Sequence, residues 1–317
     1  MAATRSRRLA PRTLAAGLLL CASLAAPAAR AADTDACRRA IVKGDAAWQH
    51  RADGAGLDGR ARSAPIERAI DSYQAALEAD PESAAARWKL VRALWFAADY
   101  ADASPETEGL HLDRATRESD TALDALAARL GLSGTLDSFE PALLAARIPP
   151  AEIEDAAGTF FWSAVAWGAW SQRRGRVEAI REGVAARLYQ AAGAVIALDP
   201  SFEEGGAHRL LARIHVEVPR VPFVTEFVNP GRAVPAAERA LEISPEHLGN
   251  RYLLALTILD VAPERRDEAI ALLAEAAHAE PRADQLVEDR AFRKAARARL
   301  AREASGEREL AEVSAGP

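Results

Sequence analysis

The chain has 317 residues, of which 27% are charged, and a formal net charge of −6 at pH 7. An acidic chain repels phosphate backbones, so this charge argues against nucleic acid as a partner. The length is large for one globular core and suits an array of small helical units.

The first 31 residues have the three-part pattern of a secretory signal peptide. Arginines at 5, 7, 8 and 12 precede an apolar run at 14–24, and the triplet A-R-A at 29–31 fits a small-residue cleavage site. The apolar run is shorter than the roughly 20 residues that span a bilayer. We therefore expect a secreted, periplasmic protein that is cleaved after Ala31, with an uncleaved anchor as the alternative.

Neither cysteine has the surroundings of a lipoprotein acylation site. Cys21 follows three leucines rather than a small residue, and Cys37 has no apolar run before it, so we do not expect lipoprotein anchoring. Cleavage after Ala31 removes five arginines and no acid, which takes the net charge from −6 to −11. Only Cys37 then remains; it could pair between chains or stay a simple thiol near the terminus.

Four segments along the chain share one ending. They are "AIDSYQAALEADP" (69–81), "LYQAAGAVIALDP" (188–200), "AVPAAERALEISP" (233–245) and "AIALLAEAAHAEP" (269–281). Each has small, large and small residues at helical spacing before a terminal proline, which cannot continue the hydrogen-bond ladder. This pattern resembles the second helix of a tetratricopeptide repeat.

The spacing of these prolines indicates an irregular array. Pro245 and Pro281 are 36 residues apart, close to the 34-residue period of that repeat, but Pro200 and Pro245 are 45 apart. The extra 11 residues fall in "VPRVPFVTEFVNP" (218–230), which joins two helices of one repeat and is biased toward an extended path by its prolines. Its apolar residues, among them Phe223, are too many for a solvated loop, so we expect them to pack.

The sequence thus predicts an all-α fold, an irregular tetratricopeptide-like array of helical hairpins (an α-solenoid) with an extended insertion at 218–230. We expect a signal peptide at 1–31, one helical domain at 32–305 and a flexible tail at 306–317. The expected helices are 35–53, 65–79, 83–98, 106–130, 137–147, 151–172, 177–198, 203–217, 230–243, 247–261, 265–279 and 284–304.

The stretch "FFWSAVAWGAW" (160–170) places five aromatic residues within three helical turns. Trp167 and Trp170 share a helix stripe with Phe160, whereas Phe161 and Trp162 extend the aromatic surface round the helix. Two interpretations stay open. The helix could belong to the core, or it could form the wall of a ligand cavity in which indole N–H groups add polar contacts.

His208 and Arg209 follow Gly205-Gly206 at the start of another expected helix. His208 and His215 are two turns apart, about 10 Å at 1.5 Å per residue, too far to share a metal ion easily, so we expect no metal site. Arg209 is spaced for surface ion pairing with its helix neighbours, or it could be buried and recognise an anionic group.

Enzyme motifs are absent from the sequence: it has no G-x-S-x-G, P-loop, H-E-x-x-H or C-x-x-C pattern. The acidic residues Glu203 and Glu204 lie near a helix start, where the helix dipole explains them better than catalysis does. We therefore expect no enzymatic activity, no catalytic residue and no cofactor.

Three segments together resemble the TRAP-transporter-associated T-component family (TatT-like proteins). They are "TFFWSAVAWGAWSQRRG" (159–175), "DPSFEEGGAHRLLARIHVEVPRVPF" (199–223) and "ISPEHLGNRYLLALTILD" (243–260). The resemblance covers roughly residues 70–280. It implies a periplasmic helical protein with a pore or cavity, a homotrimer, and association with the periplasmic substrate-binding (P) subunit of a TRAP transporter.

The residues carried over by this resemblance are Trp162, Trp167, Trp170, His208, Arg209, Phe223 and Asn250. Our leading hypothesis is a non-enzymatic accessory protein that binds or relays a small organic solute delivered by a P subunit. The solute would lie in a cavity lined by the 160–170 aromatics and the 205–223 segment. The alternative is a generic periplasmic tetratricopeptide-repeat scaffold, which binds proteins or peptides along an open groove.

Overall fold

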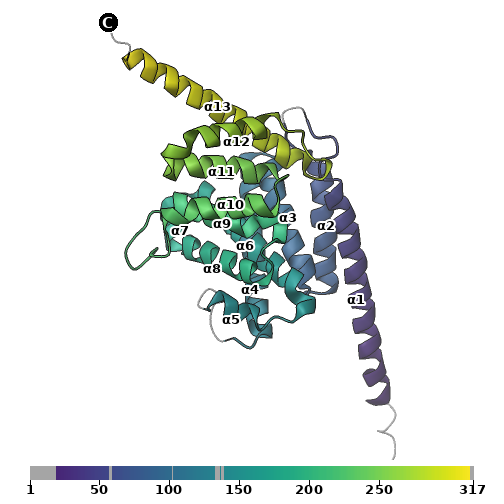
Figure 1. The fold of residues 1–317 in the computed structure, drawn as a ribbon. Helices are drawn as coiled ribbons and strands as arrows, with labels where there is room; N and C mark the ends of the chain where they lie inside the picture. Colours follow the sequence, from purple (N-terminus) through teal and green to yellow (C-terminus); the bar gives the residue numbers. More distant parts are fainter. Residues whose placement is uncertain (1–18, 57–58, 102, 133–135, 137–138, 315–317) are drawn as a thin grey trace, which may run out of the picture.

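The computed structural model describes residues 19–56, 59–101, 103–132, 136 and 139–314, which form an all-α protein (Figure 1). Within these residues the only β-type pairing is an isolated parallel bridge between Ala61 and Ala101. The helices are α1 (Leu19–Gln49), α2 (Ser63–Ala79), α3 (Ala84–Tyr100), α4 (Pro105–Arg129), α5 (Pro141–Ala145), α6 (Ile153–Arg174), α7 (Arg176–Arg181), α8 (Val184–Leu198), α9 (Phe202–Glu217), α10 (Ala233–Ile243), α11 (Leu248–Val261), α12 (Arg266–His278) and α13 (Leu286–Ser314).

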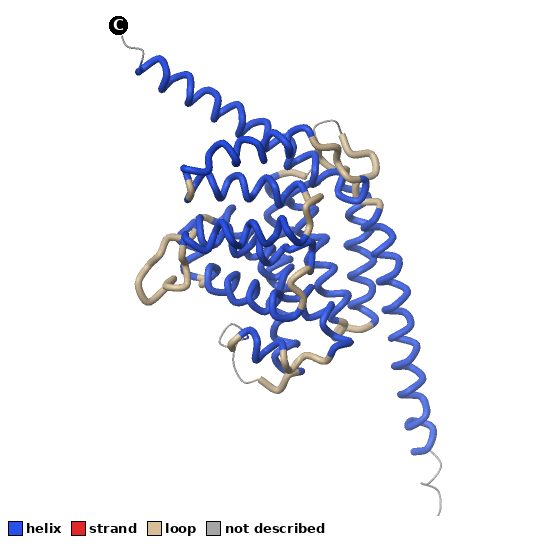
Figure 2. The backbone as a smooth tube through the Cα atoms, viewed as in Figure 1, coloured by secondary structure: helices blue, strands red, loops and turns tan. Residues whose placement is uncertain are grey.

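Successive helices pack against one another along most of the chain. Consecutive pairs are in contact from α1–α2 to α3–α4 and from α6–α7 to α12–α13. In addition, α6 packs on α3, α4 and α8, and the short α5 packs on α8. Figure 2 shows the loops that join these helices, among them the long loop between α9 and α10, which projects from the body. The predicted array of helical hairpins, solenoid-like in its sequential packing, is therefore confirmed.

The four shared sequence endings are all helix ends. Pro81, Pro200, Pro245 and Pro281 follow the C-termini of α2, α8, α10 and α12. The small–large–small pattern is buried as well. Ala69, Tyr73 and Ala76 of α2 are fully buried, and so are their counterparts Ala269, Leu273 and Ala276 of α12. Small residues at this spacing let neighbouring helices approach closely, as the pattern predicted.

Several predicted boundaries are wrong. The helix expected at 177–198 is broken into α7 and α8 at Gly183, whose φ of 63° lies in the left-handed region. Of the helix expected at 137–147, only Pro141–Ala145 is helical among the described residues. The last helix continues to Ser314, so most of the segment expected as a tail is helical.

The predicted signal peptide is only partly within the described residues. Its basic segment and the start of its apolar run, residues 1–18, lie outside them, and α1 runs from Leu19 through Ala31 without a break. Cys37, further along α1, is buried against Ala76 and Ala86. No helix in the described ranges combines the length and the apolar character needed to cross a membrane.

The apolar core forms two main clusters that meet at α9. The first involves α2, α3, α4, α6 and α8 and reaches Ala207, and the second involves α10 to α13 and begins at Ala212. Both alanines are fully buried. Helix α9 is therefore the element that joins the two halves of the array.

The beginning and the end of the array are also in contact. Arg51, just after α1, is 4% exposed and donates to the Glu288 carboxylate of α13, with Nε–Oε1 and Nη2–Oε1 distances of 3.0 and 2.8 Å. Its guanidinium also lies over the Trp48 ring, 4.4 Å from the centroid. In Figure 1 the N-terminal end of α13 accordingly lies beside the tops of α1 and α2. The helical array thus closes on itself.

Candidate functional site at the left-handed turn of α9

Helix α9 begins with a turn of left-handed backbone conformation. Glu203, Glu204 and Gly205 have φ values of 48°, 56° and 81°, all in the left-handed region. For an L-residue other than glycine this conformation costs about 1–2 kcal/mol. Such strain persists only where the surroundings determine it, and it is common at functional sites. The other non-glycine residue with positive φ in the described part of the chain is Phe223, in the loop that follows α9.

The glycine pair after these glutamates is required by close packing. A Cβ atom on Gly205 would lie 3.1 Å from the Ala240 Cα of α10, and its φ is itself unfavourable for a side chain. A Cβ atom on Gly206 would lie 2.5 Å from the ring of Phe161 on α6. Gly205-Gly206 therefore lets the left-handed turn fit between α6 and α10.

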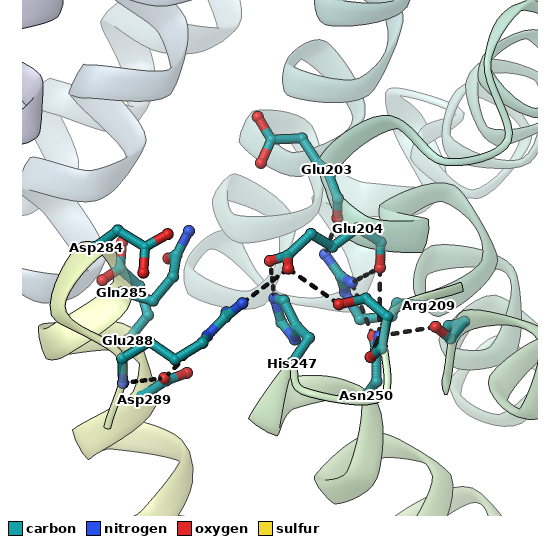
Figure 3. A network of polar contacts seen from close by, with 12 residues as sticks. Glu203, Glu204, Arg209, His247, Asn250, Asp284, Gln285, Glu288 and Asp289 are labelled. Carbon is teal, nitrogen blue, oxygen red and sulfur yellow. Dashed lines mark hydrogen bonds and ion pairs between the residues drawn. The ribbon is translucent and has the colours of Figure 1, made fainter. Parts of the chain in front are cut away.

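Arg209 holds the carbonyl groups of the left-handed turn. Its Nη1 donates to the Glu204 carbonyl and to Asn250 Oδ1, each at 2.8 Å, and its Nη2 donates to the Glu203 carbonyl at 2.8 Å (Figure 3). A planar guanidinium suits this task because its donors lie in a fixed fork. The arginine therefore acts as a brace for its own strained backbone.

Asn250 of α11 completes the brace from the other side. Its amide nitrogen donates to the carbonyls of Ala240 at 2.8 Å, Ser244 at 2.9 Å and Glu204 at 3.3 Å. The residue is 1% exposed. One buried side chain thus ties the end of α10 to the turn of α9, and its own amide donors are satisfied by these carbonyls.

The Glu204 carboxylate joins this network through its Oε1 atom. It accepts from Ser244 Oγ at 2.9 Å and from Arg282 Nη1 at 2.7 Å, and His247 Nε2 lies 3.8 Å away. Arg282 in turn contacts the buried Asp289 of α13 through its backbone N–H, at 2.9 Å. The network therefore links α9, α10, α11 and the start of α13 (Figure 3).

Burial shifts the ionisation of the basic groups in the network. It lowers the pKa of Arg209 to about 10, although Glu203 and Glu204 oppose the shift, so the guanidinium stays charged at neutral pH. Burial, with the nearby charges of Arg209 and Arg282, lowers the pKa of His247 to about 2. His247 is therefore neutral and adds no third positive charge.

Glu203 behaves differently from its neighbour. Figure 3 shows its side chain directed away from the network that holds Glu204. Burial raises the pKa of the Glu203 carboxyl above its ordinary value, against the opposing charges of Arg92 and Arg209. The Trp162 indole N–H also lies near enough to favour the charged form, yet it makes no well-formed hydrogen bond and is buried without a partner.

Trp162, which lies close to the Glu203 carboxylate, belongs to a group of aromatic rings on α3 and α6. The ring of Trp162 lies 5.2 Å from that of Trp95 and 5.1 Å from that of Phe161, between centroids. Trp95 continues to Tyr100 at 5.4 Å. Arg92 lies over the Trp48 ring at 3.9 Å, and its Nε is a second buried donor without a partner. We call Arg92, Trp95, Trp162 and Glu203 the interior cluster.

The other two predicted tryptophans belong to a different contact. Trp167 donates through Nε1 to Asp120 at 3.2 Å, and Trp170 donates to Asp113 at 2.9 Å, both on α4. Their rings pack against each other, 5.2 Å apart. Their indole N–H groups are therefore satisfied within the protein, and this end of α6 is a helix–helix contact rather than part of the interior cluster.

His208 and Phe223 lie apart from the interior cluster as well. The Nε2 atom of His208 is buried without a partner, and burial, with the charge of Arg239, lowers the pKa of its ring. Phe223 is 94% exposed at the tip of the loop between α9 and α10. The expectation that Phe223 packs in a cavity wall is wrong, because the loop turns its tip into solvent.

The predicted site residues are thus only partly brought together. Arg209 and Asn250 form a hydrogen bond with each other. Trp162 lies near the carboxylate of Glu203, whose carbonyl accepts from Arg209. Glu203 itself was missed, because an acidic residue at a helix start was attributed to the helix dipole; that explanation is wrong for a residue in a left-handed turn. The available signal was the run E-E-G-G, since glycines after a helix start indicate an unusual backbone.

A separate cavity of about 230 Å³ lies between α2, α3 and α4. Its lining includes three hydroxyl side chains and His111, whose Nε2 lies 3.4 Å from Glu67 Oε1. None of the predicted site residues lines this cavity. Within the described ranges, no three His, Cys, Asp or Glu residues gather in a way that could hold a metal ion.

Comparison with known proteins adds no assignment to this geometry. No protein-family model matches the chain, and no curated protein matches it.

Proposed function

We propose that the protein is a non-enzymatic periplasmic binding protein that takes a small organic solute at the interior cluster. In this proposal it serves a TRAP-type transport system, is exported by a signal peptide cleaved after Ala31, and docks a periplasmic substrate-binding subunit, as a homotrimer. These wider roles rest on the resemblance of the three sequence segments to the T-component family.

The observation that carries the proposal is the pair of unpartnered donors beside Glu203. A buried N–H without a partner is destabilising by about 1–3 kcal/mol, so two of them among aromatic rings call for an acceptor from elsewhere. A solute carboxylate or carbonyl could accept from Trp162 Nε1 and Arg92 Nε. The neighbouring rings of Trp95 and Trp162 would cover an apolar body.

Glu203 would contribute selectivity. Its backbone is fixed by Arg209, so its carboxyl group is positioned before a solute arrives. Because burial raises its pKa, the group can take up a proton more readily than an ordinary glutamate and then donate to a solute oxygen. We therefore favour a solute with an apolar body and a carboxylate or carbonyl end.

The proposal is tested by native mass spectrometry of the purified chain, followed by fluorescence titration with apolar carboxylic acids. Trp162→Phe keeps the aromatic bulk and removes the N–H, and should weaken binding about tenfold, the effect of one buried hydrogen bond. Trp170→Phe is the matched control, because Trp170 already donates to Asp113. Equal binding by both variants, or no bound solute at all, would contradict the proposal and favour the scaffold alternative.

A further inference from the structure

The loop between α9 and α10 exposes an apolar tip. All six residues from Pro219 to Val224 are exposed, and five of them are apolar. Val221, Phe223 and Val224 are 44%, 94% and 62% exposed. Exposed apolar side chains that gather in one place mark an interaction surface, unlike single ones scattered over the protein.

The tip is held in a fixed shape by its own hydrogen bonds. Thr225 Oγ1 accepts from the Val221 N–H at 2.7 Å and donates to the Pro219 carbonyl at 2.6 Å. The Phe223 N–H donates to the Glu226 carboxylate at 3.2 Å, and Phe223 has a strained φ of 64°. Phe223 is thus a bulky residue that is held in the left-handed region and exposed to solvent. Strain of this kind is common at functional sites, so we infer that the exposed ring contacts a partner.

The base of the loop is anchored to the body. Phe227 stacks on Tyr189 of α8, with centroids 4.4 Å apart, and Val228 is 1% exposed. The Asn229 N–H donates to His215 Nδ1 at 3.3 Å. The tip therefore projects from a firm base, as the tan loop in Figure 2 shows.

More apolar surface lies near the same end of α8. Helix α7, which leads into α8, exposes Val177 and Ile180 at 72% and 74%. Among the described residues, five of the eight large hydrophobic side chains that are strongly exposed belong to α7 or the loop. Figure 1 shows the loop standing out from the body on the side of α7.

Positive charge accompanies this apolar surface. Arg176, Arg220 and Arg232 are exposed and take part in no ion pair within the part of the chain that the structure describes. Other exposed arginines of this end, such as Arg181, are paired with a nearby carboxylate. An apolar tip with unpaired arginines beside it is complementary to a surface whose outer layer is anionic and whose interior is apolar.

The size and shape of the tip favour a lipid surface over a protein partner. A stable protein interface buries about 800 Å² on each side and involves roughly 20–30 residues per partner. The exposed apolar set here is a few side chains on a convex loop. A bilayer needs no matching pocket and is bound by a few inserted apolar groups together with nearby positive charge.

We propose that the loop tip, residues 219–224, inserts into the surface of a bilayer that contains anionic phospholipids. Phe223, Val221 and Val224 enter the acyl region, and Arg220 and Arg232 contact phosphate groups. Binding by so few side chains is weak and reversible. This proposal is independent of solute binding, since the tip lies outside the interior cluster, so either can fail alone.

The test places an environment-sensitive fluorophore on a cysteine at the tip, in the full chain with Cys21→Ser and Cys37→Ala. Val224→Cys is the probe position, and Leu143→Cys on α5, 68% exposed, is the matched control. We expect a blue shift at position 224 with vesicles of phosphatidylcholine and phosphatidylglycerol, and none at position 143. The readout is local, so it does not report on the apolar N-terminal segment.

Two further variants decide what causes the shift. Phe223→Ser should weaken vesicle binding at the tip about tenfold or more, because a buried phenyl group is lost. Arg220→Gln with Arg232→Gln should weaken binding about tenfold on the anionic vesicles and leave binding to phosphatidylcholine alone unchanged. No shift at position 224 would overturn the proposal. The proposal would also be overturned if the parent chain bound no vesicles and Phe223→Ser changed the oligomeric state, since the tip would then contact protein.

Discussion

The two halves of the stretch 199–229 both contain left-handed backbone but are supported in different ways. At Glu203–Gly205 the strained turn is buried, and its carbonyls are held by Arg209 and by Asn250, a residue 41 positions further along the chain than Arg209. At Phe223 the strained residue is exposed, and its loop is closed by Thr225 and Glu226 within a few residues. The first half thus depends on the whole array, and the second on itself.

This difference indicates which half of the stretch can change in sequence without loss of the fold. A turn whose support comes from other helices is coupled to global stability, whereas a loop that supplies its own hydrogen bonds is coupled only to its neighbours. Mutations in the two halves should therefore have unequal effects on unfolding.

The largest effect is expected for Arg209→Ala. The Glu203 carbonyl and the Asn250 amide oxygen would lose the Arg209 donor, and the Glu204 carbonyl would keep only the longer bond from Asn250. This should lower the free energy of unfolding by about 2–4 kcal/mol in urea titrations. Arg213→Ala is the control: its ion pair with Glu217 is exposed, and such pairs contribute about 0–1 kcal/mol. Equal effects of the two variants would mean that the buried hydrogen bonds of Arg209 stabilise the fold no more than an exposed ion pair does.

A smaller loss is expected for Gly206→Ala. The added Cβ would lie 2.5 Å from the Phe161 ring, and overpacking of this kind costs about 1–3 kcal/mol. Gly109→Ala in α4 serves as the contrast, since no heavy atom lies within 4 Å of its Cβ position. There we expect a gain of about 0.5–1 kcal/mol from helix propensity, measured by the same urea titration. A loss at both sites would show that the close approach at Gly206 is not the cause.

The pH dependence of Glu203→Gln should sharpen the contrast between Glu203 and Glu204. Burial raises the Glu203 pKa in the folded protein, so the native state binds more protons than the unfolded state from about pH 4.5 upward. The native chain therefore loses stability from this group as the pH rises through that window. Gln does not titrate, so the variant should gain stability relative to the native chain from acidic to neutral pH. An unchanging difference in unfolding free energy would indicate an ordinary, solvated carboxylate.

The smallest effect is expected for Phe223→Ser. Because the side chain is 94% exposed, its replacement should change the midpoint of thermal unfolding very little, equivalent to about 0.5 kcal/mol or less. Thr225→Val, which removes the hydroxyl that closes the loop, should alter protease sensitivity at 219–224 while leaving the midpoint nearly unchanged. A large loss of global stability in Phe223→Ser would mean that the tip packs on the body.

The sequence predicted the features that depend on local periodicity. The proline endings, the buried pattern of Ala269, Leu273 and Ala276, and the interruption at 218–230 follow from spacing along one helix or one repeat. The same reasoning failed at Gly183, where a single glycine breaks a helix, although glycine inside a helical pattern is a known sign of weakness.

The candidate site could be predicted only in part, for a physical reason. Glutamate has no preference for left-handed backbone, so the conformation of Glu203 is set by the distant Asn250 and by the fit against α6 and α10. Trp162, Trp167 and Trp170 share one short segment, but helical rotation directs Trp162 to α3 and the other two to α4. Contacts across the array decided both outcomes.

The ion pair between Arg51 and Glu288 has a consequence for how the chain matures. The two residues are 237 positions apart, so at about 5–20 residues per second Arg51 waits about 12–47 s of chain synthesis before its partner exists. Until then the Arg51 guanidinium faces water without its carboxylate partner, and the array is open at its N-terminal end. We expect early intermediates to remain open to proteases, and closure of the array to be a late step of folding.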